Sequence, residues 1–262
     1  MTPKRVVIMM LIGMLLCMQG WSESDASKKG VVTYADGQVK RKTVDVENWQ
    51  NAPVNTEVLS GDKVRTYIDS RAEVDLAELD IIRLAPRTVI DIVRLYEETK
   101  EKKLKTSISI EEGELWANVH QVEASTEFDI SAPVAAAAIT GTILSMDVGE
   151  DSTTRLKVYE GEVHLKRKPQ QLFKPTQTGS LKPTQIQGPT QVQGPKEVSA
   201  EVWVKIVKAM QQITVSKDGE IVNFGGFSPQ DAEEQSPWVK WNHELDQRRL
   251  YNLKKRFEEM QK

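Results

Sequence analysis

Alternating apolar and polar positions dominate the chain from residue 30 to residue 168. Short runs rich in Val, Ile and Thr recur there at close spacing and are separated by turn signals. This pattern predicts an all-β main domain, an antiparallel sandwich or β-roll of many short strands. The turn signals Asp36-Gly37 and Glu160-Gly161 predict tight hairpins, and residues 89–95 and 104–110 predict a longer hairpin with a polar tip.

The pattern changes after residue 168. Residues 169–198 are rich in Pro, Thr, Gln and Gly, and prolines recur in a six-residue step at Pro183, Pro189 and Pro195. We expect this Pro-rich segment to be an extended linker. Residues 199–262 are then expected to form a small, mostly helical C-terminal region with two amphipathic helices.

The first of these helices is expected to begin at a Ser199 cap, with an apolar face made of Val202, Trp203, Ile206, Val207 and Met210. A short strand is expected at residues 213–215. Ser236 and Pro237 then provide a cap and a first-turn proline for the second helix, which reaches the C-terminus.

The second helix carries two apolar stripes. They are Trp238, Trp241 and Leu245, followed at heptad-like spacing by Leu250, Leu253, Phe257 and Met260. An amphipathic helix must bury its stripe. The tryptophans are expected to dock within the protein. The part from Leu250 onward either docks as well or pairs with a partner helix, which makes Leu253 and Phe257 candidate partner contacts.

The N-terminus has the anatomy of a secretory signal peptide. Lys4 and Arg5 precede an apolar run at residues 6–18, which is shorter than the roughly 20 residues that cross a membrane. We expect removal of residues 1–22 and a periplasmic or secreted protein that is not an integral membrane protein. One alternative is lipidation at Cys17, although Leu16 stands where lipoprotein signals carry a small residue. Another is an uncleaved anchor, which would make the protein a membrane-tethered sensor.

Composition narrows the chemistry. The 262 residues carry 35 Lys and Arg against 38 Asp and Glu, a formal net charge of −3, so we expect no nucleic-acid binding. Cys17 is the one cysteine and lies in the expected signal peptide. The three histidines are isolated, and no nucleophile elbow, phosphate-binding loop or dinucleotide fingerprint is present. We therefore expect no catalytic, cofactor-binding or metal-binding residues, and a protein that is not an enzyme.

Four residues of the β domain are further candidate partner contacts. Arg71 and Glu73 lie two apart on one expected strand and share a face. They either form a surface pair or bind a partner's charge. Trp49 and Trp116 are either core aromatics or platforms on which a sugar stacks.

Six segments of the β domain carry short motifs in a fixed order. They are Leu-Ser-Gly-Asp-Lys-Val-Arg-Thr at 59–66, Ser-Arg-Ala-Glu-Val-Asp-Leu at 70–76, Ile-Arg-Leu-Ala-Pro-Arg-Thr at 82–88, Gly-Glu-Leu-Trp at 113–116, a proline with an alanine run and Gly-Thr at 133–142, and Val-Tyr-Glu-Gly-Glu-Val at 158–163. Together they resemble the FecR domain of bacterial extracytoplasmic signalling proteins over about half of the chain. The sequence departs from the family at Thr140, where arginine is frequent, and at Leu144, where an aromatic is common.

The resemblance implies an exported domain without regulatory machinery. In the namesake proteins a cytoplasmic segment binds a sigma factor, one helix crosses the membrane, and the periplasmic part receives a signal from an outer-membrane transporter. Only five residues precede the apolar run here, so direct sigma-factor binding is not expected. The hypothesis is a non-enzymatic binding or scaffolding module of the cell envelope, with a role in signal sensing, whose partner is an envelope protein or a glycan.

The alternative from another class is an envelope enzyme that acts on glycans. Such an enzyme needs two carboxylates that meet in a cleft. We expect that cleft, if it exists, to lie beside Trp49 or Trp116.

Overall fold

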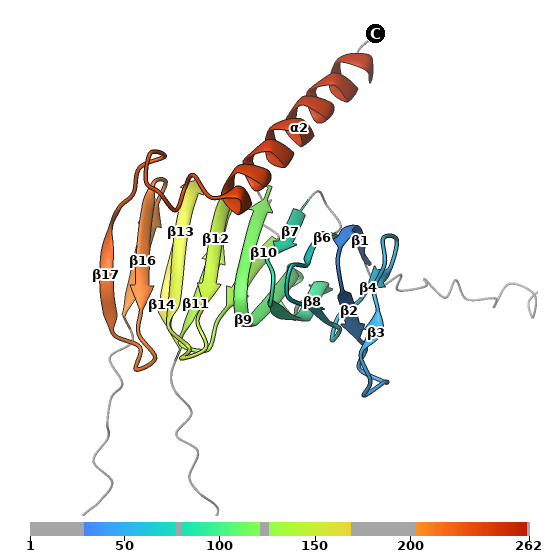
Figure 1. Ribbon diagram of the computed structural model, residues 1–262, viewed down its shortest axis with the longest axis horizontal. Helices are drawn as coiled ribbons and strands as arrows, with labels where there is room; N and C mark the ends of the chain where they lie inside the picture. Colours follow the sequence, from blue (N-terminus) through green and yellow to red (C-terminus); the bar gives the residue numbers. More distant parts are fainter. Residues whose placement is uncertain (1–28, 77–79, 121–125, 169–202, 261–262) are drawn as a thin grey trace, which may run out of the picture.

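The computed structural model describes residues 29–76, 80–120, 126–168 and 203–260 (Figure 1). The expected signal peptide at 1–22, the Pro-rich segment at 169–198 and the Ser199 cap lie outside the described residues. The described part consists of 17 strands and one helix, α2 (Pro237–Met260). An all-β main domain followed by a C-terminal helix is therefore confirmed.

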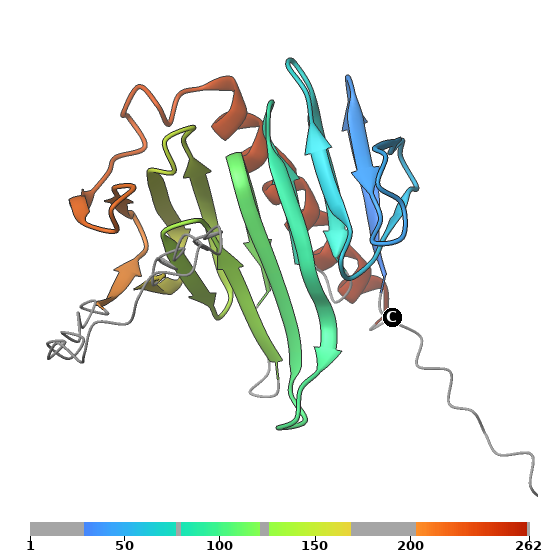
Figure 2. The same ribbon diagram turned by 90° about the horizontal axis from the view of Figure 1, so that it is seen from below.

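The strands form two sheets that enclose one apolar core. The helix-covered sheet has the spatial order β4 (Glu57–Val58), β1 (Gly30–Asp36), β6 (Arg71–Leu76), β7 (Asp80–Leu84), the second half of β9 (Leu104–Val119), β12 (Thr142–Val148), β13 (Thr154–Glu160), β16 (Gln211–Val215) and β17 (Ile221–Gly226). The second sheet has the order β3 (Gln50–Asn51), β2 (Val39–Lys42), β5 (Lys63–Thr66), β8 (Val89–Glu98), the first half of β9, β10 (Thr126–Ser131), β11 (Ala135–Ile139), β14 (Glu162–Arg167) and β15 (Val204–Lys208). Figure 2 shows the two layers from below.

Strand β9 passes from one sheet to the other at Gly113. Before this point the even-numbered residues Ile108 and Ile110 are buried in the core, and after it the odd-numbered Leu115 and Ala117 are. Gly113 has φ +89, and a Cβ there would lie 2.6 Å from the Arg87 carbonyl oxygen. Only glycine fits this bend, and the reversal turns Trp116 to the outer face beneath α2.

Two expected hairpins are corners instead. Gly37 and Gly161 have the positive φ values of turns, +71 and +83. However, β1 pairs with β4 and β6 while β2 pairs with β3 and β5. The strands around Gly161 are divided between the sheets in the same way. The turn residues predict that the chain reverses, but they do not determine which of the two sheets the next strand joins. The longer hairpin, β8 with β9, is confirmed.

The first helix expected in the C-terminal region is wrong over its described residues. Val204–Lys208 form strand β15, which pairs with β14, and Val207 lies in the same core as the β domain. A short apolar run fits a helix face or a strand equally well. Here the run forms a strand because it can pair with the open edge of β14. The Arg167 amide donates to the Trp203 carbonyl at 3.2 Å. The Pro-rich segment therefore connects two neighbouring strands, and residues 203–226 complete the sandwich.

Two other expectations for this region are confirmed. The strand expected at 213–215 is β16. Helix α2 begins at Pro237, and the Ser236 hydroxyl oxygen accepts from the Val239 amide at 3.3 Å. The helix lies against the outer face of the helix-covered sheet, and its C-terminal end extends beyond the ends of the strands (Figure 1).

Candidate functional site

A buried arginine fixes the first half of α2 to the sheet. Arg83 lies in the middle of β7 and is 1% exposed. Its Nε donates to Glu73 Oε2 at 2.6 Å, and its Nη1 donates to Asp246 Oδ1 of α2 at 2.8 Å. Asn242 Oδ1 accepts from the same nitrogen at 3.3 Å. A guanidinium stays charged, so its burial is tolerated only with such partners.

Trp116 completes this anchor. Its indole N–H donates to Asp246 Oδ2 at 3.0 Å, so both oxygens of that carboxylate have donors. The Trp116 ring packs on Tyr159 and His243, with centroids 4.5 and 5.0 Å away. Trp116 is completely buried. It is a core aromatic, and the sugar-stacking interpretation is wrong for this residue because no face of the ring is open.

A polar pocket of about 290 Å³ lies beside the start of α2. Glu114 and Asp147 stand directly opposite each other in the β9–β12 register and line it. Burial raises the pKa of both carboxyls. Ser145 donates to Glu114 at 2.8 Å, and Arg155 donates to Asp147 at 3.3 Å. Two carboxylates therefore meet near the outer face that carries Trp116, and each already has a donor.

The segment before α2 is held by opposite charges. Lys157 donates to Glu233 and to the buried Glu234, at 2.7 Å in each case. Burial lowers the pKa of Lys157, but the two hydrogen bonds and the negative charges of Glu233 and Glu234 together outweigh burial, and the net shift of this pKa is upward. The pKa of Glu233 is lowered, chiefly by its hydrogen bond from Lys157.

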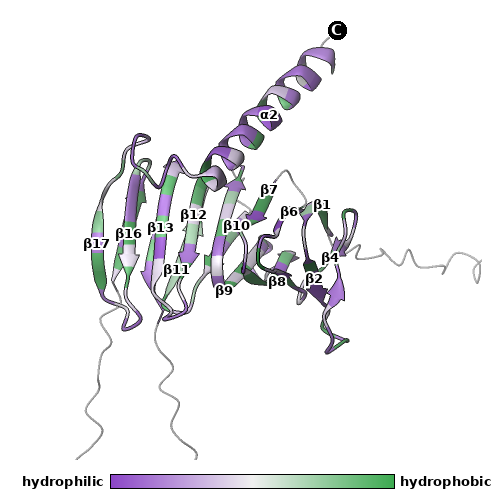
Figure 3. Ribbon diagram, viewed as in Figure 1, coloured by the Kyte–Doolittle hydropathy of each residue, from purple (hydrophilic) through white to green (hydrophobic). Residues whose placement is uncertain are grey.

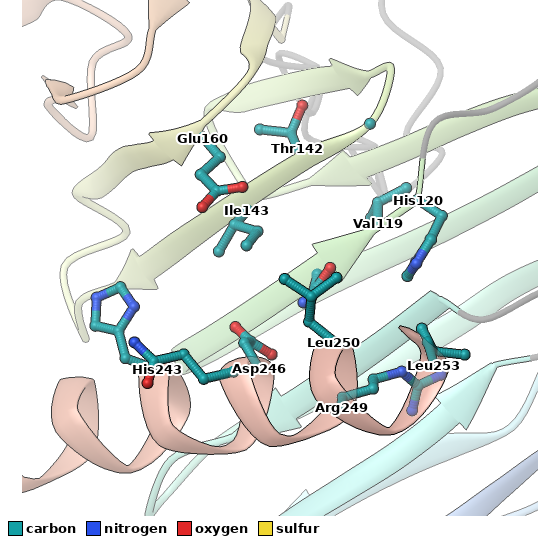
Figure 4. A pocket seen from close by; sticks show the side chains of 13 residues that line it. Val119, His120, Thr142, Ile143, Glu160, His243, Asp246, Arg249, Leu250 and Leu253 are labelled. Atoms are coloured by element: carbon teal, nitrogen blue, oxygen red, sulfur yellow. The ribbon is translucent and has the colours of Figure 1, made fainter. Parts of the chain in front are cut away.

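A groove of about 300 Å³ lies beneath the second half of α2 (Figure 4). Val119 and Ile143 line it from the sheet, and Leu250 and Leu253 from the helix. His120 lies at its far end, and its buried Nδ1 has no hydrogen-bond partner among the described residues. The groove combines an apolar floor with an unsatisfied polar atom, a combination typical of binding sites.

The residues predicted as partner contacts do not lie together. Some belong to the anchor of α2, and Leu253 lines the groove. Arg71 and Glu73 share the outer face of β6 as expected, but both serve the helix. The Arg71 guanidinium lies 5.5 Å from the centre of the Trp241 ring, and Glu73 pairs with Arg83.

Trp49 lies outside the anchor and the groove, and the Phe257 side chain is not among those that the structure describes. Trp49 precedes β3, is half-buried, and has the Arg65 guanidinium 5.3 Å from its ring centre. The structure does not bring it to the anchor or the groove. Phe257 is within α2, and its side chain lies outside the described residues.

The sequence reasoning assigned no role to the residues that organise the site, namely Arg83, Asp246, Asn242 and His120. One signal for Arg83 exists, because it interrupts an otherwise apolar run at 81–84. A charge at the centre of a fully buried strand requires a buried partner. Its partner lies 163 positions away.

A match to a known family covers the platform, the outer sheet surface on which the first half of α2 packs. The model of the FecR protein family matches residues 62–164. The chain contains a FecR domain. The match runs from β5 to β14 and includes Arg83, Trp116 and Tyr159, so the FecR domain itself provides the surface on which α2 rests. The resemblance drawn from the six motifs is confirmed.

Two solved structures are similar in part. They are crystal structures, at 1.65 and 2.50 Å resolution, of a protein from Parabacteroides distasonis ATCC 8503 described as a "putative anti-sigma factor". Each is 16% identical to this chain with a TM-score of 0.45, over 65% of this chain and 62% of the other. The chain thus spans less than two thirds of that protein's length. No curated protein matches the chain.

Within the described ranges, no helix is both long and apolar enough to span a membrane. The same residues hold no cluster of three or more His, Cys, Asp or Glu that could bind a metal ion.

Proposed function

We propose that this protein is a non-enzymatic binding module of the cell envelope, exported by residues 1–22, that presents the second half of α2 to a partner protein. The FecR domain at 62–164 supports an envelope signalling or sensor-type role. One observation carries the binding role: α2 is fixed rigidly by buried charges in its first half, yet leaves apolar side chains exposed in its second half. An exposed apolar helix face on a rigid base is typical of helix recognition.

The charges around the stripe define the partner. Leu250 and Leu253 begin a heptad-like stripe, and it is flanked by the basic residues Lys254 and Arg256. A second copy would place these basic residues against one another in either orientation, which is unfavourable. The partner we propose is therefore an amphipathic helix of another envelope protein, with acidic residues beside its apolar positions.

Site-specific photo-crosslinking in the producing cells tests this proposal. A benzophenone amino acid at Leu250 is expected to give a discrete adduct, whereas the same probe at Lys255, on another side of the same half-helix, is not. Replacing Lys254 and Arg256 by glutamate should abolish the Leu250 adduct. Equal adducts from both positions, or none from Leu250, would contradict the proposed helix partner.

Export has its own test. Intact-mass analysis of protein from the cell envelope is expected to show a chain without residues 1–22. A mass that retains these residues would support the membrane-tethered alternative. A diacylglyceryl group on Cys17 would show a lipoprotein, and either result would overturn the proposed cleavage.

One observation favours the glycan-active alternative, namely the facing carboxylates Glu114 and Asp147 with their raised pKa values. An inverting or retaining glycosidase uses such a pair. The check is release of new reducing ends from purified peptidoglycan. Activity that disappears in Glu114→Gln would replace the binding proposal. We expect no release of reducing ends by the native protein or by Glu114→Gln, because Ser145 and Arg155 already donate hydrogen bonds to these carboxylates.

A further inference from the structure

The two ends of the sandwich differ in how their edge strands are exposed. One end closes with β3 and β4, which are two residues long. The other end closes with β15 and β17, of five and six residues. Among the described residues, β17 pairs with β16 alone. An edge strand presents free backbone donors and acceptors, and proteins normally protect such an edge.

Strand β15 carries a protective charge, whereas nothing among the described residues protects the edge of β17. Lys205 stands opposite Leu165, whose side chain is buried, so the exposed Lys205 lies on the core-facing side of β15 at the open end of the sandwich. An inward-pointing charge at an edge opposes strand addition. The β17 sequence Ile-Val-Asn-Phe-Gly-Gly carries no charge and no proline, and Val222 and Phe224 are 61% and 45% exposed. Figure 3 shows β17 as a largely hydrophobic strand at the outer end of the sandwich.

The backbone of β17 is oriented for pairing. The Phe227 amide donates to the Met210 carbonyl at 3.0 Å, and Gln211 faces Gly226 in the ladder. Backbone groups alternate in direction along an antiparallel strand. The amide and carbonyl of Phe224 therefore point away from β16, toward the open edge. Phe224 stands opposite the buried Ile213 in the β16–β17 ladder, so its side chain lies on the core-facing side of β17, at the border of the core.

We propose that β17 is a strand-addition site for an extended segment of a partner protein, a surface separate from the groove beneath α2. The added strand places alternate side chains over the open end of the core, where apolar residues contact Phe224 and Ile221. A carboxylate on the same face of the added strand reaches toward Lys205 of the opposite sheet. The ligand is thus an extended peptide with alternating apolar residues and one inward acidic residue.

A second copy of the chain fits this end less well. A two-fold axis normal to the sheets that pairs β17 with its counterpart also brings the two β15 edges together. The Lys205 side chains of both copies would then enter one shared core, and like charges in an apolar environment are strongly unfavourable. The charge of Lys205 therefore selects an acidic partner strand.

A peptide titration tests the site. The probe is a fluorescently labelled peptide, Ser-Thr-Val-Thr-Glu-Thr-Val-Thr-Ser, whose one face carries Val, Glu and Val, and the control peptide has Lys in place of Glu. We expect saturable anisotropy with the Glu peptide and at least tenfold weaker binding of the Lys peptide. Lys205→Glu is expected to invert this preference. The exposed Ile206→Lys, on the outer face of β15, is the matched control and should change neither.

A second variant separates backbone pairing from charge attraction. Phe224→Pro removes the outward amide of β17 but keeps the hydrogen bonds between β17 and β16, so it should abolish binding of both peptides. If this variant does not fold, the Lys205→Glu result still tests the proposal. Equal affinity for both peptides, or no saturable binding, overturns the proposal. So does concentration-dependent dimerisation that Phe224→Pro abolishes, because the edge would then serve a second copy. Truncation after Arg249 should leave peptide binding unchanged, so this test is independent of the proposed α2 partner.

Discussion

The two halves of α2 belong to one regular helix but are held in different ways. In the first half Val239, Asn242 and Asp246 are buried against the FecR platform. In the second half Leu250 and Met260 are 54% and 73% exposed. The first half is fixed by complementary buried charges, and the second mainly by its own backbone ladder and the partial contact of Leu253. An amphipathic pattern therefore shows that a face will be buried, but a buried charge pair shows where.

Removing the anchor should have the largest effect. Arg83→Met leaves the buried carboxylate of Asp246 and the partly buried carboxylate of Glu73 without their cation, which costs about 3–5 kcal/mol of unfolding free energy. Equilibrium denaturation in urea measures this loss. A loss below about 1 kcal/mol would show that the pair does not hold the helix, since that is the value of an exposed ion pair.

Trp116→Phe tests the second donor of the same anchor. The variant keeps the ring contacts with Tyr159 but leaves Asp246 Oδ2 without its donor, so we expect a loss of about 1–3 kcal/mol. Trp49→Phe is the matched control, because Trp49 is half-buried outside the anchor, and it should lose much less. Equal losses from the two substitutions would contradict the assigned role of Trp116.

The polar pocket beside the start of α2 gives a pH signature. Burial raises the pKa of Glu114 above its ordinary 4.5, so the folded protein binds this proton more tightly than the unfolded chain does. The free energy of unfolding therefore falls as the pH rises above 4.5, because the buried carboxyl ionises less readily in the folded protein than in the unfolded chain. Glu114→Gln should melt at a higher temperature than the native protein at pH 7, with the difference vanishing near pH 4. A lower melting temperature for the variant at pH 7 would refute this sign.

Truncation after Arg249 should have the smallest effect on stability. It removes the exposed residues of α2 and keeps the Arg83 anchor and the Arg249–Asp75 pair. We expect the free energy of unfolding to change by about 0.5 kcal/mol, as for surface changes generally. Calorimetry measures it. A loss comparable to that of Arg83→Met would make the second half part of the core and remove the case for a helix partner.

The sandwich was largely predictable because local patterns determine its strands. The alternating runs identified the β domain, and the Ser236-Pro237 cap predicted where α2 begins. The partners of β1 and β2 were not predictable from the Gly37 turn, because the same turn serves a hairpin or a corner between sheets. Residues 204–208 were misassigned because the open edge of β14, a tertiary feature, determines their conformation.

The candidate site was predictable only in part. The stripe containing Leu253 showed that the helix has a face to bury, and Arg71 and Glu73 were correctly placed on one face of a strand. Their role in docking α2 depends on Arg83 and Asp246, which are far apart in the sequence and are joined only by the fold. Among the described residues the Nδ1 of His120 has no hydrogen-bond partner, and this too depends on its surroundings in the fold, which no local sequence pattern contains.

Amide hydrogen exchange along α2 tests the central difference most directly. If the first half is core and the second half is presented to a partner, amides 241–249 should exchange only through global unfolding, while amides 252–260 should exchange orders of magnitude faster. Uniform protection along the helix would contradict a presented second half. Uniformly rapid exchange would contradict the Arg83 anchor.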